Sequence, residues 1–250
     1  MDRIGLTDAA LFLDFDGTLA PLVARPELAA MAAPTRASLN RVAAASGGAV
    51  AVISGRPLAQ LDALLHPLEL PVAGSHGAEL RGIDGSIRTL GEAAQAALDE
   101  VHAGLGQLAV AENLLIERKH GAVCLHYRGR AELAGRCLDA GRGEVAAHPE
   151  LRLMEGHMVV EIALRDLDKG TALRAFMSEP PFFGRTPVAA GDDTTDEDAI
   201  RAAQALGGIG IRIGDGDSEA RIRMAGIDEF LAWLDAVSRD EAMTIGATAP

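Results

Sequence analysis

The sequence has few aromatic residues, few cysteines and no long apolar run, and each shortage excludes a class of protein. Aromatic side chains make up only 3% of the 250 residues, so aliphatic and alanine side chains must fill the core. The two cysteines, Cys124 and Cys137, are too few and too separated to suggest a disulfide framework or a zinc site, and we expect buried, reduced thiols. No run approaches the ~20 apolar residues needed to span a bilayer.

Positive charge is also scarce. The chain has 23 Lys and Arg residues against 36 Asp and Glu residues, which gives a net charge of −13. This balance argues against nonspecific binding to nucleic acid or to an anionic membrane, but a locally positive site for a small anionic substrate is still compatible with it. The first residues lack a basic segment followed by a long apolar stretch, so we expect no signal peptide and a cytoplasmic protein.

Apolar, β-branched segments alternate with amphipathic segments over most of the chain. The strands that we predict are Ala9–Leu13, Ala49–Ile53, Pro71–Gly74, Thr186–Ala190 and Ile209–Ile213. The helices that we predict are Thr35–Ala45, Pro57–Leu65, Lys169–Met177, Thr195–Ala205 and Asp228–Val237. This alternation is typical of βαβ units, so the sequence predicts an α/β protein with a Rossmann-like parallel sheet and helices on both faces.

The middle of the chain has a different pattern. Turn residues between strand-like residues predict a β-hairpin over Glu79–Thr89. After it we predict two helices and further strands, in the order Glu92–Leu105 (helix), Ala122–Tyr127 (strand), Glu132–Ala147 (helix), Leu151–Met154 (strand) and Val159–Ile162 (strand). We therefore expect an α+β domain at residues 90–164, inserted into a discontinuous core domain of residues 1–89 and 165–250. Ala242–Pro250 is expected to be a frayed tail.

Two carboxylates stand at the end of the first predicted strand. Asp14 and Asp16 follow Ala9–Leu13 directly, and Gly17 marks a tight turn. Open α/β sheets place their active sites at the carboxyl ends of the strands. Burying paired acids costs several kcal/mol unless a cation or a reaction needs them. The sequence therefore predicts that this pair is functional.

Three further segments carry polar groups to the same edge of the predicted sheet. Ser54 and Gly55 follow the second strand, where a hydroxyl and backbone amides suit an anion. Lys169 opens a predicted helix behind Asp168, a predicted N-cap, and a cation is electrostatically disfavoured at that end, which favours a functional role. The strand Thr186–Ala190 leads into an acidic segment that contains Asp192, Asp193 and Asp196. Acids also stabilise a first helical turn without any other role.

These groups suit the transfer of a phosphoryl group to water. One aspartate attacks phosphorus and forms an aspartyl-phosphate, which divides one difficult step into two easier ones. A neighbouring carboxyl group protonates the leaving alkoxide and then activates water. Mg²⁺ prefers carboxylate, phosphate and water oxygens, and it reduces the repulsion between a carboxylate and a phosphate dianion. Hydroxyl, amide and ammonium groups stabilise the charge on the equatorial oxygens.

The order of the groups resembles the haloacid dehalogenase superfamily. The residues that carry the resemblance are Asp14-Phe15-Asp16-Gly17-Thr18, Ser54, Lys169 and Gly191-Asp192-Asp193. The resemblance implies that Asp14 is the nucleophile and Asp16 the acid/base. It implies that the phosphate is held by Ser54, Gly55 and Lys169. It also implies an Mg²⁺ ion bound by Asp14, Asp16 and Asp192, with Asp193 and Asp196 in support.

A finer resemblance, to the trehalose-6-phosphate phosphatase family, covers nearly the whole chain. It rests on Ser54-Gly55-Arg56, Gly74-Ser75-His76-Gly77-Ala78-Glu79, Glu117-Arg118-Lys119, His126-Tyr127-Arg128, Glu161, Lys169-Gly170, Gly184-Arg185-Thr186-Pro187 and Gly191-Asp192-Asp193-Thr194-Thr195-Asp196-Glu197. It implies hydrolysis of trehalose 6-phosphate in trehalose biosynthesis, and a cap domain that closes over the sugar. The cap residues that it assigns to the sugar are Glu117, Lys119 and Glu161, with Arg128 on the phosphate side. We also expect a monomer, with functional pairing to a trehalose-6-phosphate synthase.

Other interpretations are compatible with parts of this pattern. A capped phosphatase for another sugar phosphate, such as sucrose 6-phosphate, would share the core motifs. A phospho-acceptor signalling domain also places an aspartate, Mg²⁺ and a lysine at the ends of a parallel sheet, although Asp16 and the inserted domain argue against it. For the charged residues Glu117, Lys119 and Glu161, the alternative to sugar binding is a surface salt bridge on an exposed sheet.

Overall fold

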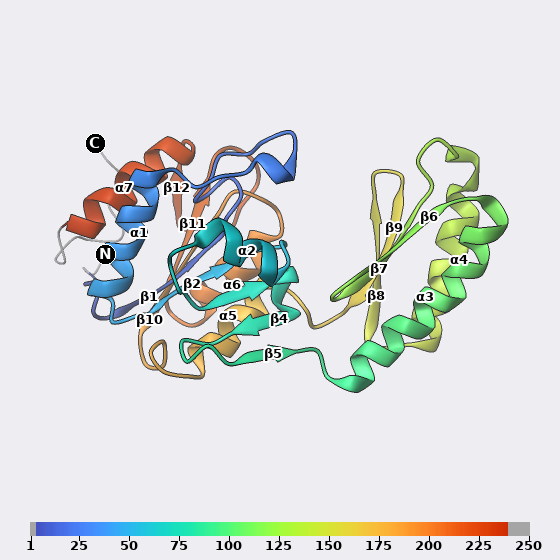
Figure 1. Cartoon of the computed structure of the whole chain (residues 1–250), viewed down its shortest axis with the longest axis horizontal. Coiled ribbons are helices and arrows are strands. Elements are labelled where there is room, and N and C mark those ends of the chain that lie inside the picture. Colours follow the sequence, from blue (N-terminus) through green and yellow to red (C-terminus); the bar gives the residue numbers. More distant parts are fainter. Residues whose placement is uncertain (1–3, 240–250) are drawn as a thin grey trace. The chain divides into compact units, whose positions relative to one another are not determined.

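The computed structural model describes residues 4–239 and divides the chain into two compact units (Figure 1). One unit combines Met1–Arg88 with Asp168–Pro250, and the other is Thr89–Leu167. The expected domain boundaries stay a prediction, because a division by contacts does not show that either part folds alone. The expected tail Ala242–Pro250 lies outside the described residues.

An eight-stranded sheet forms the centre of the first unit, in the order β12-β11-β10-β1-β2-β3-β4-β5. Its strands are β1 (Ala9–Leu13), β2 (Val50–Ile53), β3 (Val72–Gly74), β4 (Glu79–Arg81), β5 (Ile87–Thr89), β10 (Thr186–Gly191), β11 (Ile209–Ile213) and β12 (Ile222–Met224). Neighbouring strands from β12 to β3 are parallel, and β4 is antiparallel to β3. The predicted parallel sheet is confirmed, and the predicted hairpin corresponds to β4 and β5 at its edge.

Helices cover both faces of this sheet, as the alternation of apolar segments predicts (Figure 1). The helices of the first unit are α1 (Ala33–Ala45), α2 (Leu58–Leu65), α5 (Lys169–Met177), α6 (Asp196–Ala205) and α7 (Ile227–Arg239). Successive side chains of a strand point to opposite faces. In β1, Leu11 and Leu13 therefore pack with α1, α2 and α7, whereas Ala10 and Phe12 pack with α5 and α6.

Three of the few aromatic side chains pack together on one face of the central sheet. Phe12 and Phe182 have ring centroids 5.4 Å apart, and those of Phe176 and Phe182 are 5.3 Å apart. All three rings are buried beside alanines of α5 and α6. Three large rings thus fill the space that many small side chains leave on this face of the sheet.

The second unit is an antiparallel sheet covered by two helices on one face (Figure 1). The strand order is β6-β7-β9-β8, with β6 (Leu115–Lys119), β7 (Ala122–His126), β8 (Leu151–Gly156) and β9 (Val159–Leu164). Helix α3 (Glu92–Glu112) packs on β6 and β7, and helix α4 (Ala134–Ala147) packs on β8 and β9. Leu98, Leu125 and Ile162 are buried between the helices and the sheet. Every second side chain of each strand points away from the helices, to the opposite face of the sheet.

The structure corrects two of the predicted helices. The helix predicted to end at Leu105 continues to Glu112, because Ala109 is buried in the core and the left-handed residue Asn113 ends the helix instead. The helix predicted from Glu132 begins with a 3₁₀ turn at Ala131–Leu133. Among the helices that the structure describes, none is both long enough and apolar enough to cross a membrane.

Candidate active site

The parallel register of the central strands brings three polar segments to one edge of the sheet. Strand β1 lies between β10 and β2, and Leu13 is paired with Ala190 on one side and with Val52 on the other. The backbone N–H of Asp14 donates to the carbonyl oxygen of Ala190 at 3.0 Å. The segments that follow β1, β2 and β10 therefore begin side by side, where ligands bind in open α/β sheets.

Lys169 lies buried between two carboxylates. Its Nζ atom is 2.6 Å from Asp14 Oδ1 and 2.6 Å from Asp196 Oδ1, and its side chain is only 4% exposed. The helix that it opens is fixed by a capping box, in which Asp168 accepts from the Thr171 backbone N–H and donates its own N–H to the Thr171 hydroxyl. The predicted N-cap is confirmed, and it fixes the helix end that carries the lysine.

Asp14, Asp192 and Asp196 form an acidic group, in which one carboxylate oxygen of each lies within 4.8 Å of the others. Burial raises the pKa of Asp14 to about 7, while Lys169 opposes the rise and Asp196 adds to it. Burial also raises the pKa of Asp192 to about 6, with added repulsion from Asp196 and Asp193. The group thus holds more negative charge than one lysine neutralises. Three hard oxygen donors with excess negative charge fit a divalent cation.

Gly17 lies against this acidic group and has a positive φ of +78°. A Cβ atom added to it would lie 2.0 Å from Oδ2 of Asp192. Any larger residue would therefore have to displace that carboxylate as well as adopt a backbone conformation that L-residues rarely take. The glycine after the two predicted catalytic aspartates is required by this close approach.

The side chain of Asp16 points to Arg56 rather than into the acidic group. Arg56 donates from Nε to Asp16 Oδ2 at 2.6 Å and from Nη2 to Asp16 Oδ1 at 2.7 Å. Its Nη1 donates to the carbonyl oxygen of Pro26 at 3.1 Å. The acid/base and metal-binding roles expected for Asp16 stay predictions. The sequence motifs assign no function to Arg56, although the Ser-Gly-Arg triplet at the end of a strand was a signal that could have identified it.

The remaining core residues predicted to bind phosphate or to support the metal lie around this group. Ser54 is 2% exposed, and its hydroxyl oxygen accepts from the Arg56 backbone N–H at 3.2 Å. Gly55 is exposed next to it. Asp193 is exposed, with its side chain accepting from the Thr194 N–H and its own N–H donating to Asp196. The backbone of Asp193 thus orients Asp196, while its carboxylate lies outside the acidic group.

The predicted sugar-binding residues belong to the second unit. Glu117 and Lys119 are two residues apart on β6, so their side chains point to the same face of the sheet. Glu161 on β9 points to that face too, which is opposite to the helices. Lys119 Nζ is 3.7 Å from Glu161 Oε2, and both side chains are partly exposed. Arg128 is exposed just beyond the end of β7. The structure therefore groups three of the four residues, and it also contains the ion pair that the alternative interpretation expects.

Replacing Lys169 by methionine is expected to reduce the free energy of unfolding by about 3–5 kcal/mol, because it leaves two buried carboxylates without their cation. The measurement is urea denaturation of the metal-free protein. The matched control is Lys119→Met, whose side chain is 45% exposed, with an expected change within about 1 kcal/mol. Equal losses in the two variants would show that the buried pairing of Lys169 does not stabilise the fold.

Comparison with known proteins agrees with this geometry. The model of a protein family described as Trehalose-phosphatase matches residues 12–225. The chain belongs to the trehalose-phosphatase family. The trehalose-6-phosphate phosphatase of Escherichia coli (strain K12) is 38% identical over 232 residues, covering 92% of this chain and 86% of that protein. A probable trehalose-phosphate phosphatase of Sinorhizobium fredii is 40% identical over 214 residues, covering 84% of this chain and 79% of the relative.

Solved structures of the trehalose-phosphatase family share the fold. The trehalose-6-phosphate phosphatase of Aspergillus fumigatus aligns with a TM-score of 0.72 and 25% identity over 93% of both chains. A haloacid dehalogenase-like hydrolase from B. subtilis aligns with a TM-score of 0.61 at 15% identity, covering 90% of this chain and 98% of that one, which shows the fold alone. The predicted family and the predicted capped fold are confirmed. Membership of the trehalose-phosphatase family makes the chain a phosphoric monoester hydrolase.

Proposed function

We propose that the protein hydrolyses trehalose 6-phosphate to trehalose and inorganic phosphate. The names of its relatives in Escherichia coli and Sinorhizobium fredii support this substrate. The observation that carries the chemistry is the buried carboxylate of Asp14, held by Lys169 at the end of the central strand β1. A carboxylate fixed at that edge is placed to act as a nucleophile toward a bound phosphoester.

The reaction that we propose has two displacements at phosphorus. In the first, a carboxylate oxygen of Asp14 bonds to phosphorus, the bond from phosphorus to the sugar oxygen breaks, and Asp16 gives its proton to that oxygen. In the second, Asp16 removes a proton from water, whose oxygen bonds to phosphorus as the bond to Asp14 breaks. Inorganic phosphate leaves, and both aspartates return to their starting forms. Arg56 holds Asp16 by two hydrogen bonds before the substrate binds.

We propose Mg²⁺ as the cation that the acidic group binds. Asp14 and Asp192 would hold it, with Asp196 beside them, and Asp16 is the further predicted ligand. The hard oxygen donors and the phosphate substrate favour Mg²⁺ over softer ions. When bound, this ion supplies the positive charge that lets an anionic carboxylate approach a phosphate dianion. Lys169 and the hydroxyl of Ser54 are the groups of this chain that we assign to the phosphate oxygens.

We propose that the charged face of the second unit binds the sugar. Glu117, Lys119 and Glu161 lie together on one face of the antiparallel sheet, and Arg128 follows β7. Charged groups form the stronger hydrogen bonds to hydroxyls. The ion pair of Lys119 and Glu161 is partly exposed, so exchanging it for sugar contacts costs little.

A panel of sugar phosphates, assayed for phosphate release, tests the proposed substrate. We expect kcat/KM for trehalose 6-phosphate to exceed that for glucose 6-phosphate or sucrose 6-phosphate by at least about 100-fold. Glucose 6-phosphate lacks the hydroxyls of a second sugar, and sucrose 6-phosphate arranges its hydroxyls differently, so both leave polar groups of the site unpaired. Comparable rates for all three would leave a capped phosphatase of broad specificity and would overturn the proposed substrate.

Replacing Glu161 by alanine is expected to raise KM for trehalose 6-phosphate by about tenfold, the effect of one lost charge-assisted hydrogen bond of about 1.5 kcal/mol. Steady-state kinetics measures the change. The control is Glu155→Ala on β8. This exposed residue is paired with Val160, the neighbour of Glu161, so its side chain points to the opposite face of the same sheet. A Glu161 variant that loses stability but keeps normal kinetics in its folded fraction would return this residue to a structural role.

A phospho-acceptor signalling domain is the other class of function that the core motifs allow. The family match argues against it, since the matched residues 12–225 include the inserted unit that a bare receiver lacks. Repeated release of phosphate by one enzyme molecule separates the two functions. A protein that is phosphorylated once and keeps the phosphate would overturn hydrolysis as the function.

The expected monomer, the cytoplasmic location and the pairing with a trehalose-6-phosphate synthase stay predictions. Each is compatible with a phosphatase that acts on a small sugar phosphate. Sedimentation of the pure protein tests the oligomeric state, and sedimentation with the synthase added tests physical association.

A further inference from the structure

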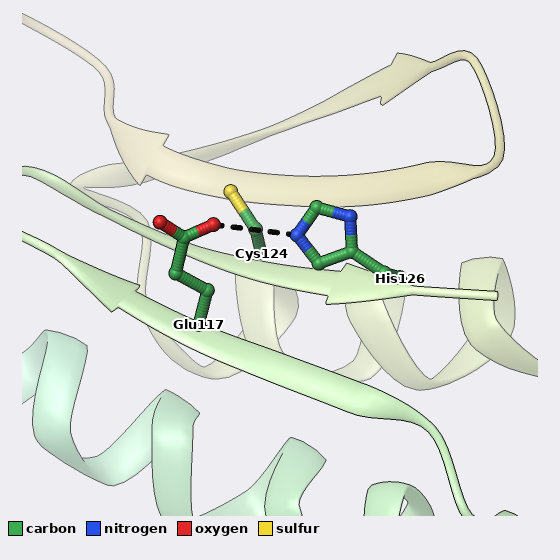
Figure 2. Close-up of side chains that lie close together, drawn as sticks. All are labelled: Glu117, Cys124 and His126. Carbon is green, nitrogen blue, oxygen red and sulfur yellow. Dashed lines mark hydrogen bonds and ion pairs between the residues drawn. The ribbon is translucent and has the colours of Figure 1, made fainter. Parts of the chain in front are cut away.

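The second unit contains a group of side chains that the proposed reaction does not explain. Figure 2 shows Glu117, Cys124 and His126 converging on one face of the antiparallel sheet. One potential ligand atom of each lies within 4.8 Å of the others. His126 Nε2 is 3.4 Å from Glu117 Oε2. A carboxylate oxygen, a thiol sulfur and an imidazole nitrogen therefore surround one point.

The register of the sheet produces this convergence. Glu117 on β6 lies directly opposite Cys124 on β7, and His126 lies two residues further along β7, on the same face. The spacing of the two cysteines gave no sign of a metal site. Cys137 lies on α4, where it is buried in the core, and takes no part in this group. The third ligand comes from a neighbouring strand, so it depends on strand pairing rather than on a sequence motif.

We propose that Glu117, Cys124 and His126 bind a divalent zinc ion. Cysteine sulfur, histidine nitrogen and carboxylate oxygen are the ligands that Zn²⁺ takes in proteins, at about 2.0–2.3 Å, and three of them leave the fourth tetrahedral position for water. These bond lengths correspond to ligand atoms about 3.3–3.8 Å apart. The contact between Glu117 and His126 already has this spacing, and the exposed side chain of Glu117 is free to close the remainder.

The charges of the ligands balance the charge of a divalent ion. Zn²⁺ bound to the Cys124 thiolate and the Glu117 carboxylate is neutral, and the thiol proton leaves to solvent as the ion binds. The nearby ion pair of Lys119 and Glu161 is neutral as well. The Cys124 thiol donates to Glu161 Oε2 at 3.3 Å, a contact that is lost when the ion displaces the thiol proton.

This site differs in chemistry from the acidic group of the first unit. Asp14, Asp192 and Asp196 offer oxygen atoms alone, which favour Mg²⁺. The second group adds sulfur and nitrogen, which favour Zn²⁺ and its neighbours in the transition series. The two groups therefore select different ions, and sulfur ligation distinguishes them experimentally.

Zinc bound here would also compete with the substrate, an inference that rests on the proposed function. Glu117 is one of the residues that we assign to the sugar. An ion that occupies its carboxylate would raise KM for trehalose 6-phosphate without touching Asp14 or Lys169. The enzyme would then be inhibited by zinc at a site remote in sequence from its catalytic aspartates.

Cobalt(II) titration of the zinc-free 250-residue protein, with Mg²⁺ in excess, tests the site. Cobalt(II) bound to a thiolate gives a charge-transfer absorption in the near ultraviolet, which oxygen ligands do not give. We expect this band in the wild type and in Cys137→Ala, its absence in Cys124→Ser, and its displacement by one equivalent of Zn²⁺. No band in the wild type, or a band that persists in Cys124→Ser, would overturn the proposal.

Two further measurements keep the test independent of folding and of the proposed function. Circular dichroism checks that Cys124→Ser is folded, and His126→Gln, at a half-buried position, removes a second ligand. Each variant should weaken zinc binding by more than about 100-fold, which exceeds the loss of about 10–100-fold typical of groups that only support a ligand. Phosphate release without zinc reports the proposed function separately. Zinc should raise KM in the wild type but not in Cys124→Ser, and an equal rise in both would overturn the competition.

Discussion

Asp14→Asn is expected to reduce the turnover of trehalose 6-phosphate by at least about 10⁴-fold, because the amide offers no nucleophilic carboxylate oxygen. The variant should remain folded, since asparagine has the same shape and its oxygen still accepts from Lys169. Steady-state phosphate release measures the loss. Rapid acid quench with labelled substrate should trap a phosphoenzyme in the wild type and none in the variant.

The matched control for this variant is Asp193→Asn. Asp193 follows the same strand as Asp192 and carries the same charge, but its carboxylate is exposed and lies outside the acidic group. We expect its turnover to stay within about tenfold of the wild type, because this exposed carboxylate does not contact the acidic residues that would hold the ion. Multiple turnovers by Asp14→Asn would rule out Asp14 as the nucleophile, and equal losses in both variants would point to charge rather than to covalent chemistry.

Asp16→Asn is expected to lower kcat by about 10²–10⁴-fold, the usual contribution of a general acid or base. The loss of kcat should differ between the two displacements when the leaving group needs no proton. p-Nitrophenolate leaves phosphorus without needing a proton, so the first displacement should survive with p-nitrophenyl phosphate as substrate. The second displacement still needs a base. A burst of one equivalent of p-nitrophenolate, followed by a slow steady state, is the expected signature.

The burst separates the roles of the two aspartates. Asp14→Asn should give neither a burst nor a steady state, while Asp16→Asn should give the burst and accumulate phosphoenzyme. Arg56→Lys is a useful companion, because it keeps a positive charge but loses the paired hydrogen bonds to Asp16. Unchanged steady-state turnover of trehalose 6-phosphate by Asp16→Asn would show that Asp16 is not the acid/base.

Most of the core architecture could be predicted from the sequence, because short apolar strands and capped helices leave local signals. The bounds of Ala9–Leu13 and Lys169–Met177 coincide with β1 and α5. The buried run fixes the strand, and Asp168 with Thr171 fixes the start of the helix. Parallel pairing then places the strand ends at one edge, which brings Asp14 and Asp192 together without any knowledge of side-chain conformations.

The contacts that escaped prediction depend on side-chain direction and on strand register. The pairing of Asp16 with Arg56 joins segments forty residues apart, and nothing local indicates which way either side chain turns. The true end of α3 depends on the burial of Ala109 against the sheet, a tertiary contact that outweighs the helix-breaking tendency of the two interior glycines, Gly104 and Gly106. The meeting of Glu117 with Cys124 follows from the pairing of β6 and β7, which alternation alone does not set.

The central claim is that a divalent cation in the acidic group allows Asp14 to attack the phosphate of trehalose 6-phosphate. The direct test is phosphate release by chelator-treated protein before and after Mg²⁺ is restored. We predict that activity falls to background on chelation, returns in proportion to the Mg²⁺ bound, and is not restored by Mg²⁺ in Asp14→Asn. Hydrolysis that continues undiminished in the chelated protein would contradict the mechanism.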